Sequence, residues 1–237
     1  MTDPQRTGTL PDMCKTTDRA VMDIQHEFQV LALQRRLVKW WRQTGTESEF
    51  PWRKRETPRY HSLVVEVLLA RTRAESVRDV YPKFFRTFPN PEALAGACDV
   101  VIQELLKPLG LIKRVEQLKR LGQAIVNGIP GDVGALSKLP GVGLYAANAF
   151  CSLHLGKRAS VPDANSARLF GRIFGIDFST TPRRRKSFYE FCHSVTPKRR
   201  FREFNYAVLD FGRKICRPRN PVCSSCPLKD ICLHNGL

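Results

Sequence analysis

Two carboxylates in this chain lie in sequence surroundings that suit opposite roles in acid-assisted chemistry. Asp163 precedes a segment that predicts a helix starting near Ala164, and capping N–H groups together with the helix dipole favour an ionised aspartate there. Glu66 lies within the apolar run Leu63–Leu69, where burial should raise the pKa of a carboxyl and allow it to donate a proton. Two carboxyl groups with separated pKa values are typical of an acid working beside an electrostatic stabiliser. The alternatives are that Asp163 only caps a helix and that Glu66 is buried against an arginine.

A glycine turn lies between two apolar segments upstream of the aspartate, in the run Leu139-Pro140-Gly141-Val142-Gly143. Two glycines around one valine allow a tight turn with exposed backbone N–H groups. A helix that begins at Gly143 would direct its positive end at the same place, which suits an anion such as a DNA phosphate. Glycine turns also join helices without any binding role. The turn by itself therefore does not establish DNA binding. Together with the basic charge and the other motifs of the chain, it predicts DNA contacts by Leu139, Gly141, Val142 and Gly143.

Four of the eight cysteines fall near the end of the chain with the spacing Cys216-x6-Cys223-x2-Cys226-x5-Cys232. In a reducing compartment such a group favours metal ligation over disulfides. Structural zinc, the alternative, usually has two Cys-x2-Cys pairs, whereas this spacing suits four thiolates on one 4Fe–4S cluster. The other four cysteines are interpreted as buried thiols. The histidines show no ligand spacing and receive no role: His26, His61, His154, His193 and His234.

The net charge of +17, from 39 Lys and Arg against 22 Asp and Glu, indicates a polyanion as partner. About half of the excess lies between Arg183 and Arg219, where twelve basic residues stand against three acidic ones. A solvated basic face is the alternative interpretation. The sequence has neither an apolar run near the ~20 residues of a membrane span nor a signal-peptide core in residues 1–20, so we expect a cytoplasmic protein with no membrane partner.

The elements that must position these residues are predicted to be helices. Residues 1–20 lack periodicity and are expected to form a disordered tail, whereas apolar residues between Ile24 and Arg42 return at helical spacing up to a capping Gly45. Further helical patterns and no convincing alternating strand follow, so the fold class is all-α. The expected helical segments lie around Leu63–Ala70, Val77–Phe85, Pro91–Ala97, Val100–Leu106 and Lys113–Asn127.

The glycine hairpin, the aspartate and the 6-2-5 cysteine loop, in this order, resemble the helix-hairpin-helix DNA glycosylases of the endonuclease III family over residues 25–232. In the bifunctional members a lysine lies two positions after the second hairpin glycine and eighteen before the aspartate, and here that position is Tyr145. The chain is most similar to the thymine/guanine mismatch glycosylases. The runs that carry this similarity are Phe50–Arg53, Glu66–Thr72, Leu139–Tyr145, Val161–Asn165 and Phe204–Phe211.

The resemblance implies two helical domains with double-stranded DNA in the cleft between them. A six-helix barrel of residues 52–158 would contain the hairpin 139–143, and an iron–sulfur cluster domain of residues 159–237 would pack against an N-terminal helix in residues 21–51. The protein is expected to be a monomer associated with the nucleoid.

The same resemblance implies a glycosylase that flips a nucleotide out of the duplex. Asp163 would stabilise the positive charge left on the sugar, and Glu66 would donate to the departing base. Tyr145 has no amine for a Schiff base, so the enzyme should leave an intact abasic strand; a core tyrosine is the alternative. Arg71 is expected to fill the gap in the duplex, at a position where relatives carry two long polar residues and this chain has Ala70-Arg71. A further departure is the residue inserted in Pro58-Arg59-Tyr60.

The expected activity is removal of thymine, and of uracil, opposite guanine. Two alternatives stay open: an adenine glycosylase acting opposite guanine or oxidised guanine, and a non-catalytic iron–sulfur module that binds DNA. Adenine enzymes usually carry a further C-terminal domain, whereas this sequence ends five residues after Cys232, so we expect the first alternative to be less favoured. The presence of both Glu66 and Asp163 argues against the second.

Overall fold

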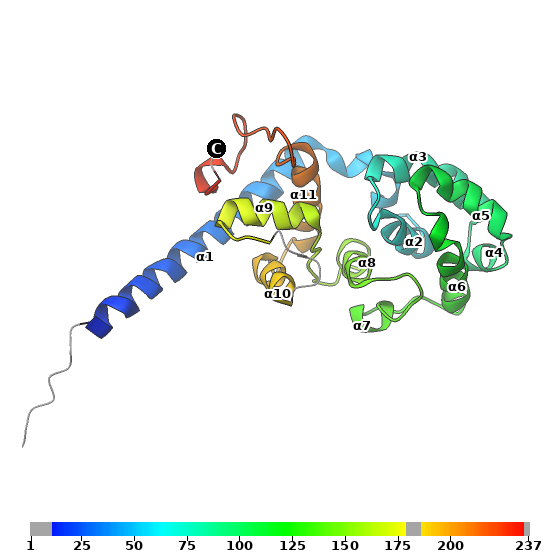
Figure 1. The fold of residues 1–237 in the computed structure, drawn as a ribbon, viewed down its shortest axis with the longest axis horizontal. Helices are drawn as coiled ribbons and strands as arrows, with labels where there is room; N and C mark the ends of the chain where they lie inside the picture. Colours follow the sequence, from blue (N-terminus) through cyan, green and yellow to red (C-terminus); the bar gives the residue numbers. More distant parts are fainter. Residues whose placement is uncertain (1–10, 179–185, 235–237) are drawn as a thin grey trace, which may run out of the picture.

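The computed structural model describes residues 11–178 and 186–234, and within these ranges all regular structure is helical, as predicted (Figure 1). None of the described helices has the length and apolar composition needed to cross a bilayer. The α-helices are α1 (Pro11–Thr44), α2 (Arg59–Leu69), α3 (Ala74–Thr87), α4 (Pro91–Ala95), α5 (Asp99–Leu106), α6 (Val115–Ile125), α7 (Val133–Leu136), α8 (Leu144–Ala149), α9 (Ala164–Phe174), α10 (Lys186–Val195) and α11 (Phe201–Lys214). Shorter turns are η1 (Thr46–Glu49), η2 (Pro51–Arg53), η3 (Lys107–Leu109), η4 (Ile112–Arg114), η7 (Lys229–Ile231) and the π-helical η5 (Phe150–His154).

Helix α1 differs from the prediction at its start. It begins at Pro11, so the expected tail is wrong for residues 11–20, while residues 1–10 lie outside the described part of the chain. Apolar periodicity marks only the part of a helix that packs against something, and Figure 1 shows the first turns of α1 projecting away from the rest. The predicted end is confirmed, because Gly45 follows Thr44 with a left-handed φ of 62°.

One hydrophobic core is built from residues between Phe50 and Ala159. Helix α2 is central to it, because all of its residues from Ser62 to Leu68 are buried. The aromatic side chains of α3 and the apolar faces of α5 and α6 close around α2. A helix buried on every side explains why the sequence there is a nearly continuous apolar run rather than an amphipathic pattern.

A second core joins chain segments that are far apart in sequence. Leu33, Leu37 and Trp41 of α1 pack with the buried faces of α9, α10 and α11. The segment α8–η5 belongs to both cores, since Phe150 and Cys151 pack in the first while Ala149 and Leu153 pack in the second. In Figure 1 the first core lies on the right and the second on the left, with α8 between them.

Candidate active site

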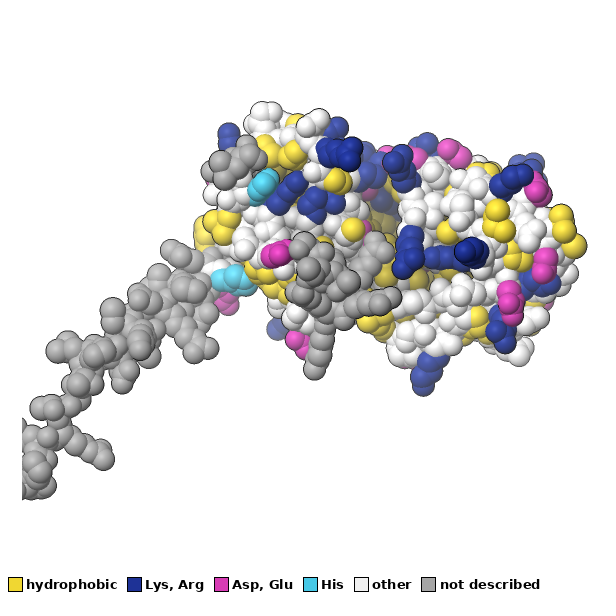
Figure 2. All heavy atoms as spheres, in the orientation of Figure 1, with side chains coloured by type: hydrophobic (Ala, Val, Ile, Leu, Met, Phe, Trp, Pro, Cys, Tyr) yellow, Lys and Arg dark blue, Asp and Glu magenta, His cyan; other side chains and the backbone are white. Residues whose placement is uncertain are grey.

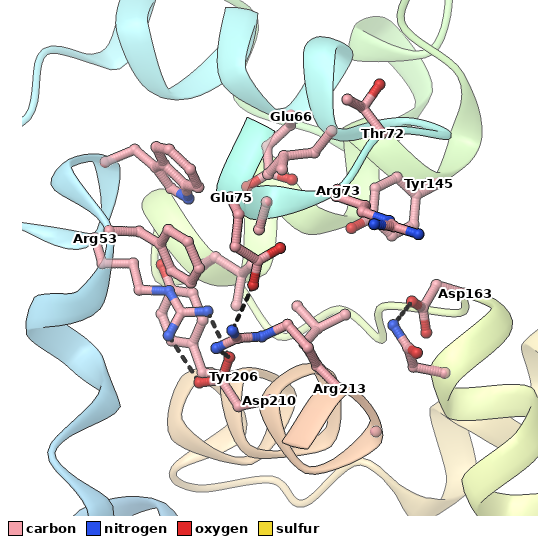
Figure 3. Close-up of a pocket in the computed structure, with 18 of the residues that line it drawn as sticks. Arg53, Glu66, Thr72, Arg73, Glu75, Tyr145, Asp163, Tyr206, Asp210 and Arg213 are labelled. Carbon is pink, nitrogen blue, oxygen red and sulfur yellow. Dashed lines mark hydrogen bonds and ion pairs between the residues drawn. The ribbon is translucent and has the colours of Figure 1, made fainter. Parts of the chain in front are cut away.

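A cavity of about 750 Å³ lies between the two cores and receives side chains from both. The three residues predicted to be catalytic, Glu66, Tyr145 and Asp163, all line it, although up to 97 positions separate them in sequence. Figure 2 shows Lys and Arg side chains in dark blue around the hollow between the two halves of the molecule. The other polar residues of the lining, several of which Figure 3 labels, are Arg53, Thr72, Arg73, Glu75, Asn165, Tyr206, Asp210, Arg213, Arg217 and Arg219.

Asp163 is the N-cap of α9, as predicted, and at the same time faces the cavity. Its Oδ1 accepts a 2.7 Å hydrogen bond from the backbone N–H of Ser166, whose hydroxyl in turn accepts from the Asp163 N–H at 2.7 Å. Its Oδ2 accepts from the Asn165 side chain at 2.8 Å. Both carboxylate oxygens are therefore fixed, so capping and a role in the cavity are compatible.

Asn165 is itself positioned by a close approach of α11. A Cβ added to Gly212 would lie 2.6 Å from the Asn165 Cβ, closer than carbon atoms can pack. Glycine at this position therefore lets α11 pass directly over the first turn of α9. The Asn165 Oδ1 accepts a 2.8 Å hydrogen bond from Arg168, which leaves its amide nitrogen to donate to Asp163.

Glu66 is 1% exposed on α2 and has a histidine as partner, not the arginine considered as the alternative. Its Oε1 lies 2.8 Å from Nε2 of His154, while its Oε2 is buried without a hydrogen-bond partner in the protein. His154 received no role in the sequence analysis, because 88 positions separate the two residues and no motif surrounds it. Only the packing of η5 against α2 brings them together.

Tyr145 lies in the first turn of α8 and is partly buried, with contacts to both hydrophobic cores. In Figure 3 it lies on the same side of the cavity as Asp163, while Arg53 and Asp210 lie on the opposite side. The ring therefore both packs between the cores and faces the cavity, so the two interpretations of Tyr145 are compatible.

Asp210 of α11 lies at the centre of the cavity wall that faces Tyr145 and Asp163. It accepts two hydrogen bonds from Arg53, at 2.7 and 2.9 Å, and one from Trp41 Nε1 at 3.1 Å. Arg53 and Asp210 are 5% and 1% exposed, so this is a buried ion pair. The sequence singled out Arg53 only as part of the run Phe50–Arg53 that carries the family resemblance, and nothing near it in sequence indicated a partner 157 positions away.

Arg213, one turn after Asp210, joins the two halves of the molecule. Its guanidinium donates to Glu75 of α3 at 2.6 Å and to Glu49 of η1 at 2.7 Å. Burial alone would raise the pKa of Glu49, but hydrogen bonds from Arg213 and Lys214 lower it to about 2. Glu49 therefore keeps its negative charge throughout the neutral pH range, and so its ion pair with Arg213 is retained there.

The glycine turn at residues 139–143, predicted to contact a DNA phosphate, is a tight turn directly before α8. Gly141 has a φ of +73°, a left-handed conformation that side chains rarely adopt, and the Val142 N–H donates to the Leu139 carbonyl at 3.1 Å. Val142 is 3% exposed and packs in the first core. Its amide and side chain are used within the protein, whereas Gly143 has open space around it. A phosphate would therefore meet the backbone at Gly141, Gly143 and the first turn of α8.

Arg71 is exposed at the end of α2 and has a φ of 75°, which is unusual for a residue other than glycine. The turn is held by Arg114, whose guanidinium donates to the carbonyls of Val67 at 2.6 Å and Ala70 at 3.0 Å. A smaller cavity of about 310 Å³ places Arg71 near Tyr145 and Asp163. Strained backbone that the surroundings hold in place is common at ligand-binding loops.

The four C-terminal cysteines line one shared apolar space with residues of α9 and α11. Burial, together with the charges of the neighbouring cysteines, raises the pKa of the Cys226 thiol. A metal centre that takes all four as thiolates would remove this repulsion, so the donor set fits an iron–sulfur cluster. No three His, Cys, Asp or Glu side chains in the described ranges form a site for a single metal ion. The ligands of the cluster would be Cys216, Cys223, Cys226 and Cys232.

Comparison with known proteins identifies two family models in the chain. Residues 64–193 match the HhH-GPD superfamily of base excision DNA repair proteins, and residues 216–232 match the iron–sulfur binding domain of endonuclease III. A thymine/uracil-DNA glycosylase of Pyrobaculum aerophilum is 38% identical, over 83% of this chain and 89% of its own length. A thymine-DNA glycosylase of Aeropyrum pernix is 36% identical, over 87% and 95%. The solved structure of a thermostable thymine-DNA glycosylase superposes with a TM-score of 0.79 at 31% identity, covering 89% of this chain and 98% of that one.

Proposed function

The chain belongs to the HhH-GPD superfamily of base excision DNA repair proteins, and we propose that it removes thymine, and uracil, paired with guanine in duplex DNA. It is a DNA glycosylase of the iron–sulfur branch. One observation carries the proposal: Tyr145, at the position where the resemblance predicts the lysine of bifunctional members, lines one cavity together with Glu66 and Asp163. The names of the thymine and thymine/uracil glycosylases described above support the choice of base.

The reaction begins when the mispaired nucleotide rotates out of the stack, which costs least at a wobble pair. A cavity of about 750 Å³ has room for the extruded base and its sugar. As the bond between base and sugar breaks, positive charge develops on the sugar, and the fixed carboxylate of Asp163 stabilises it in a site shielded from water. Glu66, buried and with Oε2 free, provides a hydrogen bond to the departing base.

Tyr145 determines the product in this proposal. A phenol cannot attack the sugar to form a Schiff base, so water completes the reaction and the DNA strand stays intact. Its partly buried ring forms part of the cavity wall and would contact the flipped pyrimidine.

The protein also binds the DNA backbone through residues that surround the cavity. The Gly141–Gly143 turn contacts the phosphate backbone, and the basic stretch from Arg183 to Arg219 neutralises further phosphates; its residues 183–185 lie outside the described part of the chain. Arg217 and Arg219 of this stretch line the cavity between the two cores. Cys216, Cys223, Cys226 and Cys232 hold the cluster, which organises this DNA-facing loop when bound. The enzyme acts as a monomer on mismatched duplexes in the cytoplasm, at the nucleoid.

A panel of labelled duplexes tests the choice of base and the intact strand. We expect base release from T:G and U:G duplexes, seen as a shortened strand only after alkali cleaves the abasic site. Matched T:A duplex is the control for unspecific release. Release confined to A:G or A opposite oxidised guanine would replace the thymine proposal with the adenine alternative, and strand breaks without alkali would refute the monofunctional reaction.

Arg71 is proposed to occupy the space that the flipped nucleotide leaves in the duplex. An Arg71→Ala variant should lose about tenfold in the single-turnover rate on a T:G duplex, because the guanidinium would stack on the neighbouring bases and stabilise the opened helix, and tenfold corresponds to about 1.4 kcal/mol. The control is Arg78→Ala, which removes an exposed arginine of α3 that pairs only with its neighbour Asp79 at 3.4 Å. Equal rates for the two variants would show that another residue fills the gap.

A further inference from the structure

The Glu66 carboxyl is held by one oxygen only. His154 Nε2 lies 2.8 Å from Oε1, and the two side chains are 7% and 2% exposed. Oε2 has no hydrogen-bond partner in the protein, although it is buried and its residue lines the cavity. A buried polar atom without a partner costs free energy, so its retention at a reaction site points to use by a substrate.

His154 reaches Glu66 because the helix widens before it. After α8 the chain makes the π-helical turn η5, and His154 is its last residue. Widened turns of this kind are rare and frequently lie at functional sites. The turn is fixed on both sides, since Phe150 and Cys151 pack in the first core and Leu153 in the second.

The hydrogen bond between Nε2 and Oε1 contains one proton, and its position decides what Oε2 can do. When the imidazole donates from Nε2, Oε1 is the acceptor, and a second proton can reside on Oε2, the oxygen without a partner. When Nε2 is the acceptor, the carboxyl proton must lie on Oε1, and Oε2 can only accept. The state of His154 therefore determines whether Glu66 can donate to a departing base.

Several charged groups near the Glu66–His154 pair already form ion pairs or hydrogen bonds within the protein. On η2 and α11, Arg53 pairs with Asp210 at 2.7 Å, and Arg202 donates to the carbonyls of Leu153 and Arg53 at 2.8 and 3.1 Å. On α3, Glu75 pairs with Arg213 at 2.6 Å. At the start of α9, both oxygens of Asp163 accept hydrogen bonds. The other titratable or charged groups of the lining are the phenols of Tyr145 on α8 and Tyr206 on α11 and the guanidinium groups of Arg73, Arg217 and Arg219. Burial raises the pKa of Tyr206 to about 12.

We propose that His154 is a positioning residue for base excision, which donates from Nε2 to Glu66 Oε1 so that Oε2 delivers the proton to the leaving base. The electron pair of the glycosidic bond leaves with the base, and the base takes the proton from Oε2. The water that adds to the sugar carbon returns one proton to Oε2, so the pair ends as it began. This proposal rests on the glycosylase function above and does not depend on which base is removed.

Two substitutions of His154 separate positioning from packing. His154→Leu removes the donor, and we expect the single-turnover rate at neutral pH to fall about 10- to 100-fold with unchanged affinity for mismatched DNA. His154→Gln retains an N–H that can reach Oε1 but does not titrate, so most of the rate should return.

A Glu66→Gln background makes the test specific, because His154→Leu should cause no further loss when the carboxyl is already absent. His61→Leu is the matched control: this α2 histidine bonds Tyr81 at 3.3 Å and stacks on Phe85, outside the cavity lining. All variants are assayed on whichever mismatch the wild-type protein processes. Wild-type rates for both His154 variants, additive losses in the Glu66→Gln background, or an equal loss in His61→Leu would overturn the proposal. Release from adenine duplexes alone would overturn only the choice of base, and no release from any duplex would overturn both.

Discussion

An Asp163→Asn variant is expected to release base at least about 10²- to 10³-fold more slowly than wild type, which is the cost of removing one preorganised stabilising group from an active site. Asparagine caps helices as well as aspartate does, so α9 should persist. The variant therefore removes the negative charge facing the sugar and leaves the fold in place. Single-turnover assays on a T:G duplex measure the rate, and thermal unfolding checks the fold.

Asp132→Asn is the matched control for Asp163→Asn. Asp132 also caps a helix, since its Oδ1 accepts from the Ala135 N–H at 2.8 Å, but it is absent from the cavity lining. Its substitution should leave base release unchanged. The catalytic assignment of Asp163 fails if Asp163→Asn retains full activity, or if both variants lose activity to the same extent.

An Asp210→Ala variant is expected to lower the free energy of unfolding by about 3–5 kcal/mol, the range found when one partner of a buried ion pair is removed. The reason is that Arg53 stays buried without its counter-charge, and Trp41 Nε1 loses its acceptor. Urea unfolding followed by tryptophan fluorescence measures the change, because Trp41 and Trp52 are both buried near the site.

Asp79→Ala tests whether burial is the cause. Asp79 also pairs with an arginine, but the pair is exposed, with a separation of 3.4 Å and an aspartate side chain that is 70% exposed. Exposed pairs contribute about 0–1 kcal/mol, so this variant should unfold close to the wild type. Similar losses of stability in both variants would contradict the conclusion that burial of the Arg53–Asp210 ion pair makes Asp210 important for stability.

Local patterns made much of the fold predictable. The all-helical class is confirmed, and so are the end of α1 at Gly45 and the cap of α9 at Asp163. Each depends on residues only a few positions apart, where spacing and side-chain type carry the physical signal. The start of α1 was mispredicted because no apolar periodicity marks a helix that continues beyond its packing surface.

Long-range contacts were not predictable in the same way. The partner of Glu66 is His154 rather than an arginine, and Arg213 joins segments as distant as Glu49 and Glu75. Such pairs depend on how helices pack, and neither residue of a pair carries a local mark of its partner. The π-helical turn that directs His154 toward Glu66 also departs from the regular spacing that a sequence pattern assumes.

The sequence by itself determined the type of protein. The glycine turn, Asp163 and the four-cysteine spacing specify the superfamily and its cluster. They could do so because backbone conformation, helix capping and metal ligation depend on residues that are close together in sequence. From the family resemblance it also predicted that Tyr145 replaces the lysine of the bifunctional members. Only the tertiary structure decided the environment of the two carboxylates. Packing of η5 against α2 gave Glu66 a histidine on one oxygen and left the other oxygen buried without a partner among the described residues, and that arrangement follows from burial and shape rather than from spacing.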